Sequence, residues 1–420
     1  MRITLVLVAS AALASVALAA TAGAQDSLET RVTTSRVPIP VRQLASKESA
    51  DTTRLTDVSS VRHLPNGSVI VNDVQRRQLV VYDKSLQQAR IIADTSSNSP
   101  NPYGLRTANG SLIPYQGDST LFIDLDSQAF LVIDGAGTFA RVMAPVRASD
   151  MFLIASSQYG ASQFDAKGRL FYRGIRRNSN DGFEFTGGNS RRVTTEPDSA
   201  PILRMDFDKR SVDSVAFLKI SAPKSVFIST SNMAFSRRMI NPLPVSDEWT
   251  LLPDGTIAIV RGQDYHVDLI APDGKRTSGP RLPFDWRRIT KEDKQAIIDS
   301  VRKADAERVA KLPPAPPSQF SIPQSNEFVE PSELPDYYPP VRQGQVRADY
   351  EGNLWILPST SKDAKNGLLY DVVNREGALV ERVQLPKDRT LVGFGPGGVL
   401  YLSWVRAPGK ATLERATVAR

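Results

Sequence analysis

The sequence contains no cysteine and only two histidines, His63 and His266. The lack of cysteine excludes disulfides, thiolate metal ligands, a cysteine nucleophile and a lipid anchor on cysteine. Two isolated histidines are too few for a multi-histidine metal site. The chain must therefore be stabilised by core burial alone, which its 420 residues allow, and neither a bound metal nor another cofactor is expected.

Long hydrophobic runs are also missing, apart from one at the N-terminus. There, Arg2 precedes the apolar stretch ITLVLVASAALASVALAA, and Ala22-Gly23-Ala24 has the small-residue pattern of a signal-peptidase site. This pattern predicts a signal peptide over residues 1–24. The mature chain, 25–420, is then exported to the periplasm or out of the cell and has no membrane span. The alternative is a retained membrane anchor, because the stretch approaches spanning length.

Neither sign of charge is in large excess. The chain has 52 lysines and arginines against 45 aspartates and glutamates, and its net charge is +7. Over a chain of this length that surplus is mild and is not a nucleic-acid signature. The expected partner is therefore a small molecule, a saccharide or another protein, and the chain is expected to be a monomer.

Short β-type runs separated by glycine and acidic turns recur in the same order along the chain. In the first copy a turn at Gly67 is followed 16 residues later by an acidic turn at Asp83. The copies cover residues 61–94, 112–143, 162–174 with 201–220, 249–276, 346–359 with 367–385, and 392–418. Four strands joined as antiparallel hairpins and repeated at about 40–50 residues are typical of propeller blades. The sequence therefore predicts an all-β fold, a six-bladed β-propeller with an inserted helix and a Pro-rich arm on one face.

The sixth copy is short of its outermost strand. The segment RVTTSRVPIPVRQLA, residues 31–45, is extended in character and has no place in the other copies. An unpaired last sheet would expose a strand edge. We therefore expect the N-terminal segment to pair with the last blade and close the ring.

The units LPNGSVIVND, PDGTIAIV and DYEGNLWI resemble blades of exported bacterial propellers of the NHL-like, TolB-like and gluconolactonase-like kinds. The resemblance covers nearly the whole mature chain and rests on structural turns. In the gluconolactonase-like family it implies a divalent metal held by Glu, Asn and Asp at strand ends. Here Gln343-Gly344 stands where the metal aspartate is expected, and the entry to the first blade offers only Asp57.

Three hypotheses for the function follow. The first is an exported binding module that uses its loop-decorated face to hold a ligand. The second is a metal-assisted hydrolase or lactonase of the gluconolactonase-like kind with a divergent ligand set. The third is a sensor or scaffold ectodomain held at the membrane by its N-terminal segment. A propeller fold by itself does not decide among them.

Three long insertions, residues 175–200, 223–246 and 287–340, fall in connections that reach the same face of the predicted ring. The last contains the best helix signal of the chain, with Thr290 and Asp293 as a capping box and prolines from Pro313 onward as a stop. The helix and the Pro-rich arm either cover the central cavity as a lid or decorate a blade edge.

Arginine doublets are the most suggestive candidate binding feature, because they all lie in connections assigned to this face and guanidinium groups suit carboxylate and phosphate ligands. The alternative is that neighbouring acidic residues pair with them in solvated loops. The doublets are Arg76 and Arg77, Arg176 and Arg177, Arg191 and Arg192, Arg237 and Arg238, and Arg287 and Arg288.

Two further pairs are candidates. Tyr337 and Tyr338 could stack on a sugar or could hold the returning arm in place. Asp247 and Glu248 begin the inner strand of the fourth copy, where a carboxylate pair could bind a cation or simply be solvated. The sequence identifies no catalytic residue.

Overall fold

The computed structural model describes residues 38–49, 55–96, 101, 103–104, 112–156, 160–176, 190–229, 234–311, 325–359 and 366–419. The predicted signal peptide, Arg177 and the prolines of the arm at 313–323 lie outside the described residues. The chain divides into Met1–Pro38 and Ile39–Arg420, and every element below belongs to the second unit.

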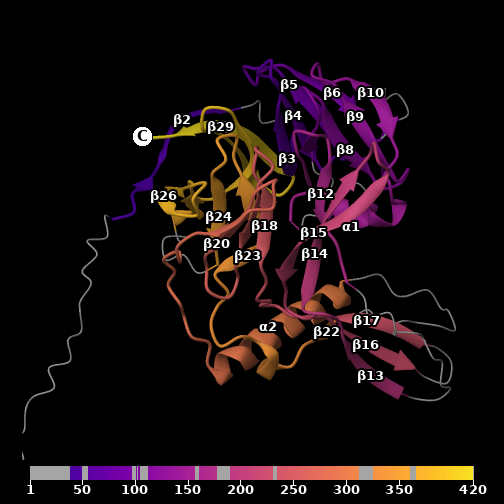
Figure 1. The fold of residues 1–420 in the computed structure, drawn as a ribbon, viewed down its shortest axis with the longest axis vertical. Coiled ribbons are helices and arrows are strands. Elements are labelled where there is room, and N and C mark those ends of the chain that lie inside the picture. Colours follow the sequence, from indigo (N-terminus) through magenta and orange to yellow (C-terminus); the bar gives the residue numbers. More distant parts are fainter. Residues whose placement is uncertain are drawn as a thin grey trace, which may run out of the picture. The chain divides into compact units, whose positions relative to one another are not determined.

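Seven sheets contain the described strands, and six of them follow the six sequence repeats in order (Figure 1). Sheet 1 has β3 (Val58–His63), β4 (Val69–Asp73), β5 (Gln78–Tyr82) and β6 (Ala89–Ala93). Sheet 2 has β7 (Leu112–Pro114), β8 (Thr120–Asp124), β9 (Ala129–Ile133) and β10 (Phe139–Met143). Sheet 3 has β11 (Gln163–Phe164), β12 (Leu170–Arg173), β14 (Ser199–Asp206) and β15 (Ser211–Lys219).

The other three repeats form sheets of the same kind. Sheet 4 has β18 (Glu248–Leu251), β19 (Ile257–Val260), β20 (Val267–Ile270) and β21 (Arg276–Ser278). Sheet 5 has β23 (Val341–Ala348), β24 (Leu354–Pro358), β25 (Leu369–Val373) and β26 (Leu379–Gln384), with β1 (Val41–Arg42) added parallel to β26. Sheet 6 has β27 (Arg389–Gly395), β28 (Val399–Ala407), β29 (Lys410–Val418) and β2 (Leu44–Ser49). The predicted all-β character is confirmed, while the number of blades stays a prediction.

The hairpins within the repeats depend on glycine turns. Gly67 has φ +85° and its N–H donates to the carbonyl oxygen of Leu64 at 2.9 Å. Gly255 has the same φ and donates to Leu252 at 2.9 Å. A side chain resists this left-handed backbone, so glycine sets the turn and the turn sets the register of the flanking strands.

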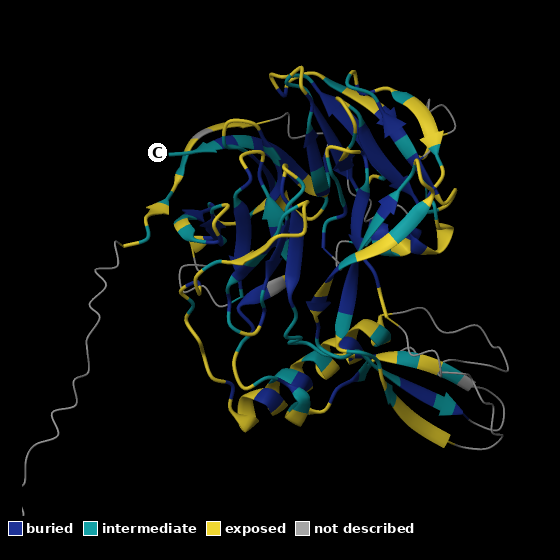
Figure 2. Ribbon diagram, viewed as in Figure 1, coloured by how far each residue is buried: buried dark blue, intermediate teal, exposed yellow. Residues whose placement is uncertain are grey.

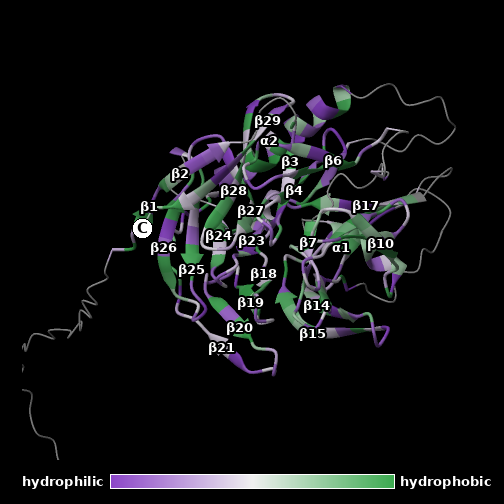
Figure 3. Cartoon of the chain, turned by 90° about the horizontal axis from the view of Figure 1, so that it is seen from above, coloured by the Kyte–Doolittle hydropathy of each residue, from purple (hydrophilic) through white to green (hydrophobic). Residues whose placement is uncertain are grey.

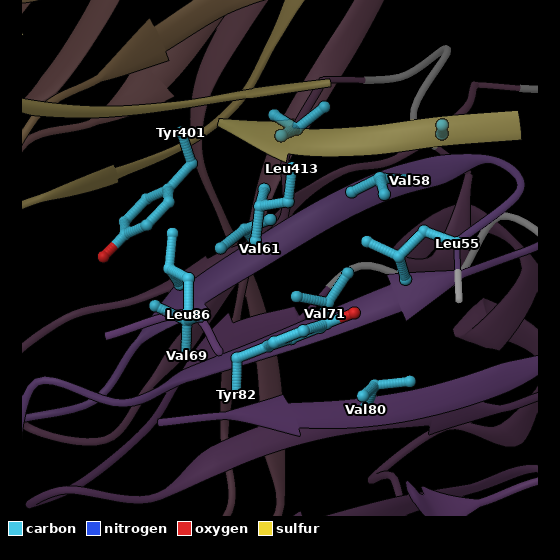
Figure 4. Close-up of a cluster of buried hydrophobic side chains, with 12 residues drawn as sticks. Leu55, Val58, Val61, Val69, Val71, Val80, Tyr82, Leu86, Tyr401 and Leu413 are labelled. Atoms are coloured by element: carbon cyan, nitrogen blue, oxygen red, sulfur yellow. The ribbon is translucent and has the colours of Figure 1, made fainter. Parts of the chain in front are cut away.

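The sheets pack against one another through apolar side chains on both faces. Figure 4 shows one such interface, where Tyr401 and Leu413 of sheet 6 face Val61, Val69 and Val71 of sheet 1. Burying a side chain of this size contributes roughly 2 kcal/mol. The middle strands are accordingly buried, whereas the outer strand β10 is largely exposed (Figure 2). Hydropathy follows the same division, with β25 and β28 hydrophobic and β21 hydrophilic (Figure 3).

The N-terminal strand β2 pairs antiparallel with β29, so sheet 6 joins the two ends of the described chain. The paired residues begin at Leu44, near the end of the segment 31–45. Arg415 of β29 is salt-bridged to Glu48 of β2 and donates to the carbonyl oxygen of Lys84 in sheet 1 at 2.7 Å. These contacts connect β2, β29 and the first repeat.

The three insertions meet in a seventh sheet, which we call the insertion sheet. Its strands are β13 (Ser190–Thr195), β16 (Lys224–Ser229), β17 (Ala234–Ile240) and β22 (Glu327–Phe328). Figure 1 shows β13, β16 and β17 near the helix α2 (Lys291–Ala310) and away from the outer strands of sheet 2. Ile298 of α2 is fully buried among Val226, Met239 and Leu334. The insertions 223–246 and 287–340 thus share a small core of their own, and the insertion 175–200 joins them through the pairing of β13 with β16.

The predicted capping box of α2 is confirmed. The Thr290 hydroxyl accepts from the Asp293 N–H at 3.1 Å, and the Asp293 carboxylate accepts from the Thr290 N–H at 3.0 Å. Asp305, one of two buried charged residues of α2, accepts from Arg308 Nη2 and from Asn326 N, both at 2.7 Å. The other helix is α1 (Met151–Ala155), and neither helix of the described chain is both long and apolar enough to span a membrane.

Candidate functional site

The inner strands of the six repeat sheets are neighbours in a closed order. β3 lies beside β7, β7 beside β11, β11 beside β18, β18 beside β23, and β27 beside β3. Between β23 and β27, Arg347 Nη1 donates to the carbonyl oxygen of Leu391 at 3.0 Å. The inner strands therefore surround a common space.

That space is a cavity of about 670 Å³, which we call the inner cavity. Every inner strand contributes to its wall. The lining residues are 59–63 from β3, 112 and 114 from β7, 161–164 just before and within β11, 251–253 at the end of β18, 343–345 and 347–350 from β23 and the turn after it, and 392–394 from β27. This volume lies in the range of cavities that hold small organic ligands.

Arg62 is the most unusual residue of the wall. Its side chain is 8% exposed, and its Nη1 donates to the carbonyl oxygen of His63 and to the hydroxyl of Tyr350. Its Nε is buried without a hydrogen-bond partner, and no acidic side chain of the described residues is salt-bridged to it. A guanidinium group in this setting is desolvated without a compensating negative charge.

Ser60 adds a second free donor on the same strand. Ser60 lies opposite Asn72 and Arg62 opposite Ile70 in the β3–β4 ladder, with a regular register between them. Alternate residues of a strand point to the same side. The Ser60 Oγ is also buried without a partner, so two unsatisfied polar groups share one side of β3.

Most other polar groups of the wall are already engaged. The Asp349 carboxylate accepts from Asn353 N at 2.8 Å and from Trp355 Nε1 at 3.0 Å. Gln163 donates to Thr250 Oγ1 at 2.7 Å and accepts from Leu251 N at 3.0 Å. These side chains stabilise the wall, whereas Ser60 Oγ and Arg62 Nε are buried without a hydrogen-bond partner.

The environment of His63 favours its neutral form. Burial lowers the pKa of its imidazole, and the positive charges of Arg62 and Arg415 lower it further. Its Nδ1 lies 2.8 Å from the hydroxyl of Tyr401, whose own pKa is raised to about 12, chiefly by burial. The two guanidinium groups of the wall, Arg62 and Arg347, therefore supply its positive charge.

The structure places the arginine doublets on separate elements. Arg76 and Arg77 are in the β4–β5 turn, where Arg77 donates to the carbonyl oxygen of Tyr103 at 3.3 Å. Arg176 follows β12 and donates to Ser199 Oγ at 3.0 Å. None of the described doublet residues lines the inner cavity.

The remaining doublets belong to the insertions. Arg191 pairs with Glu327 at 3.3 Å. Arg192 and Arg237 lie over the rings of Phe227 and Phe235. The exposed Arg238 is opposite Ser225 in the β16–β17 ladder, and Arg287 and Arg288 precede α2. These contacts engage Arg191, Arg192 and Arg237 in pairing and packing within the insertions.

The tyrosine pair contacts the segment just before α2. The Tyr338 ring lies 4.8 Å from the Arg287 guanidinium carbon, and its N–H donates to the Arg287 carbonyl oxygen at 3.1 Å. Tyr337 is 46% exposed and meets Trp286 edge to face, with ring centroids 6.3 Å apart. Both tyrosines therefore join the two ends of the 287–340 insertion.

Asp247 and Glu248 are both buried, and their carboxylates contact different groups. Asp247 accepts from Arg261 Nη1 at 2.6 Å, from Lys219 N at 2.8 Å and from Gly262 N at 3.1 Å. Glu248 Oε2 accepts from Gly344 N at 2.9 Å, while its Oε1 has no partner. Successive strand residues point to opposite sides, so the two carboxylates do not converge.

The environment of Glu248 favours its protonated form. Burial raises the pKa of this carboxyl to about 7, although the Gly344 N–H and the charge of Arg173 act in the opposite direction. Within the described chain, no group of three or more histidine, aspartate or glutamate side chains is placed to hold a metal ion.

A second cavity of about 510 Å³ lies where sheets 3 and 4 meet the insertions. Its wall includes Lys219, Asp247, Arg261 and His266. Lys219 pairs with Asp198, Arg261 with Asp247, and both ring nitrogens of His266 lie near carboxylate oxygens. These charges are paired within the protein, in contrast to Arg62.

Sequence reasoning did not single out Ser60, Arg62 or Arg347. The signal available was an arginine inside the otherwise β-type run VSSVRHL, residues 58–64. An arginine at a strand end is ordinary on a solvent-facing strand. It is informative only when the strand is known to be an inner one.

No family model matches the chain, and no curated protein matches it in sequence. Among solved structures, a virginiamycin B lyase from Staphylococcus aureus is similar at 10% identity, with 88% of this chain and 98% of that chain covered and a TM-score of 0.39. A regucalcin from Agrobacterium tumefaciens, described as a calcium-binding protein, has 11% identity, coverages of 90% and 96%, and a TM-score of 0.36. A member of the DUF4221 family from Bacteroides vulgatus has 8% identity, coverages of 90% and 98%, and a TM-score of 0.46.

These neighbours, which also include a gluconolactonase-like protein, are of the kinds that the blade motifs resemble. At TM-scores below 0.5, nothing about the activity of this chain follows from them.

Proposed function

We propose that the chain is an exported six-bladed β-propeller that binds a small-molecule ligand in its inner cavity. The six repeat sheets with neighbouring inner strands support the ring, and the pairing of β2 with β29 supports its closure. The N-terminal pattern of residues 1–24 supports export. The observation that carries the binding role is the inner cavity itself, whose volume suits a ligand and whose wall retains unsatisfied donors.

The inner cavity replaces the loop-decorated face as the proposed site. In the described insertions, Arg176, Arg191, Arg192, Arg237, Arg287 and the tyrosine pair have partners within the protein. The wall of the inner cavity offers Ser60 and Arg62, which have free donor atoms.

The alternative of a metal-assisted hydrolase requires several ligands that converge on the cavity. Among the described lining residues, Asp349 is the one acidic side chain, and its oxygens already accept from Asn353 and Trp355. The imidazole of His63 is bonded to Tyr401. This donor set does not fit a divalent metal ion, which prefers several free oxygen or nitrogen ligands.

A thermal-shift screen with a chemically diverse set of small organic molecules tests the binding role. A ligand at 100 times its Kd stabilises the folded chain by about 2.7 kcal/mol. We expect at least one compound class to raise the melting temperature by several degrees. Ala161→Phe, which places a ring into the inner cavity, should abolish that rise.

Ala304→Phe on the exposed side of α2 is the matched control and should bind as the unchanged chain does. If Ala161→Phe binds as well as Ala304→Phe, the ligand is not in the inner cavity and the proposal fails.

A further inference from the structure

We infer that the ligand of the inner cavity is an organic oxyanion with an apolar body, and that Arg62 and Ser60 hold its charged end. This inference rests on the proposed function and names its ligand class. It follows from four features of the wall: an uncompensated buried charge, a second donor beside it, the positive balance of the other charged groups, and an apolar surface around them.

The first feature is the charge of Arg62. Its side chain is more than nine-tenths buried, and Nη1 is used by the His63 carbonyl oxygen and the Tyr350 hydroxyl. Neither acceptor is an anion, because one is a peptide oxygen and the other a phenol. Buried charges in proteins are as a rule paired, and the described residues provide no carboxylate for this one. An anionic ligand would supply the missing partner.

The second feature is the placement of the free donors. The Arg62 Nε and the Ser60 Oγ are both buried, both without a partner, and on the same side of β3. An arginine side chain can bind a carboxylate or phosphate group through two parallel hydrogen bonds, and a serine hydroxyl can donate a third. The arrangement therefore suits an oxygen-rich anionic group better than a halide or a neutral carbonyl.

The third feature is the charge balance of the rest of the wall. Arg347 adds a second guanidinium group, which is not salt-bridged to any described acidic residue. The Asp349 carboxylate is directed to Asn353 and Trp355 in its own turn. The potential in the cavity is therefore positive, and it acts through a medium that screens less than water does.

The apolar residues of the wall indicate what the anion is attached to. Phe164, Leu251, Val392 and Phe394 come from three different inner strands and face the same cavity. A bare inorganic anion would leave this surface in contact with water, whereas an aliphatic or aromatic body would cover it. The cavity thus combines an anion contact with room for a hydrophobic group.

Calorimetric titration with matched probes tests the inference in the full-length mature chain. The probes are 4-phenylbutyrate, its primary amide, and inorganic phosphate. We expect the carboxylate to bind at least tenfold more tightly than both the isosteric amide and phosphate. In Arg62→Met the carboxylate should lose that advantage, while in Arg62→Lys a weaker preference should remain because a point charge replaces the planar fork.

Arg90→Met is the matched control, because Arg90 also donates to a backbone carbonyl oxygen, that of Ala136 at 3.1 Å, but lies outside the inner cavity. It should bind the carboxylate as the unchanged chain does. The comparison of carboxylate with amide uses the unchanged chain, so it does not depend on the folding of any variant.

Equal binding of the amide and the carboxylate would overturn the inference and leave the proposed function intact. If phosphate binds as tightly as 4-phenylbutyrate does, the inference that the ligand has an apolar body is overturned. An unchanged carboxylate preference in Arg62→Met would remove Arg62 from the site. If the broad screen finds no compound that depends on the inner cavity, the proposed function itself fails.

Discussion

Replacing Leu44–Ser49 with six glycine and serine residues is expected to lower the melting temperature by at least about 10 °C or to prevent folding. β2 pairs with β29 over five residue positions, and each glycine placed in a strand costs about 0.5–1 kcal/mol in backbone entropy, which weakens this pairing. Leu44 also packs on the core between sheets 5 and 6. Loss of β2 would expose the long edge of β29 to water and would remove Glu48, the salt-bridge partner of Arg415.

The matched control replaces Val41–Arg42 with glycine and serine. That change removes β1, which adds two residues to the edge of β26. Its effect on the melting temperature should be within a few degrees. Circular dichroism on both variants provides the measurement. If the β2 variant has the same melting temperature as the β1 variant, the N-terminal strand does not hold sheet 6 together.

The adjacent carboxylates Asp247 and Glu248 should respond in opposite directions when each is made neutral. Asp247→Asn is expected to destabilise the chain by about 3 kcal/mol, because the buried ion pair loses its negative partner. The aspartate accepts from Lys219 at the end of β15 and from Arg261 and Gly262 after β19. An asparagine keeps one acceptor and directs N–H groups at the donors of its partners.

Glu248→Gln should instead stabilise the chain above pH 7. The pKa of the Glu248 carboxyl is about 7 in the folded chain and 4.5 in the reference state. Between these values the folded chain holds a proton that the unfolded chain has lost. The contribution of Glu248 to the free energy of unfolding is therefore fully present below pH 4.5, and it is lost as the pH rises to about 7. At pH 8 the glutamine should gain roughly 3 kcal/mol, since one pKa unit is worth about 1.4 kcal/mol.

Urea unfolding at pH 4.5 and pH 8 measures both effects. Glu248→Gln should match the unchanged chain at the lower pH and exceed it at the higher one, while Asp247→Asn should be less stable at pH 8. A loss of stability in Glu248→Gln at pH 8 would show that this carboxyl is ionised and paired in the folded chain.

The repeat sheets could be predicted because their evidence is local. The strand residues alternate or are uniformly apolar, and the turns carry a glycine that the backbone requires, as at Gly67 and Gly255. The helix α2 can be predicted for the same reason, since its capping box lies within four consecutive residues.

The insertion sheet could not be predicted, because its strands have little sequence signal. β13 is almost wholly exposed, and β22 has only two residues, Glu327 and Phe328. Arg191 and Arg192 lie within β13, so a charged doublet that suggested a loop is part of a strand. The pairing of β13 with β16 and of β17 with β22 joins segments far apart in the chain.

The site was missed for a related reason. Arg62 becomes a buried, uncompensated charge only when six inner strands surround it, and no short window of sequence contains that information. The sequence offers Asp247 and Glu248 as a shared cation site, but strand geometry directs their contacts to opposite sides. Their burial depends on sheets 3 and 5, which lie elsewhere in the chain.

A crystal structure of the chain with bound 4-phenylbutyrate tests the central claim most directly. The account predicts one ligand in the inner cavity, with its carboxylate within hydrogen-bond distance of Arg62 Nε and Ser60 Oγ and its ring beside Phe164 or Phe394. A ligand found instead in the cavity lined by Lys219 and Arg261, or bound against the insertion sheet with the inner cavity unoccupied, would contradict it.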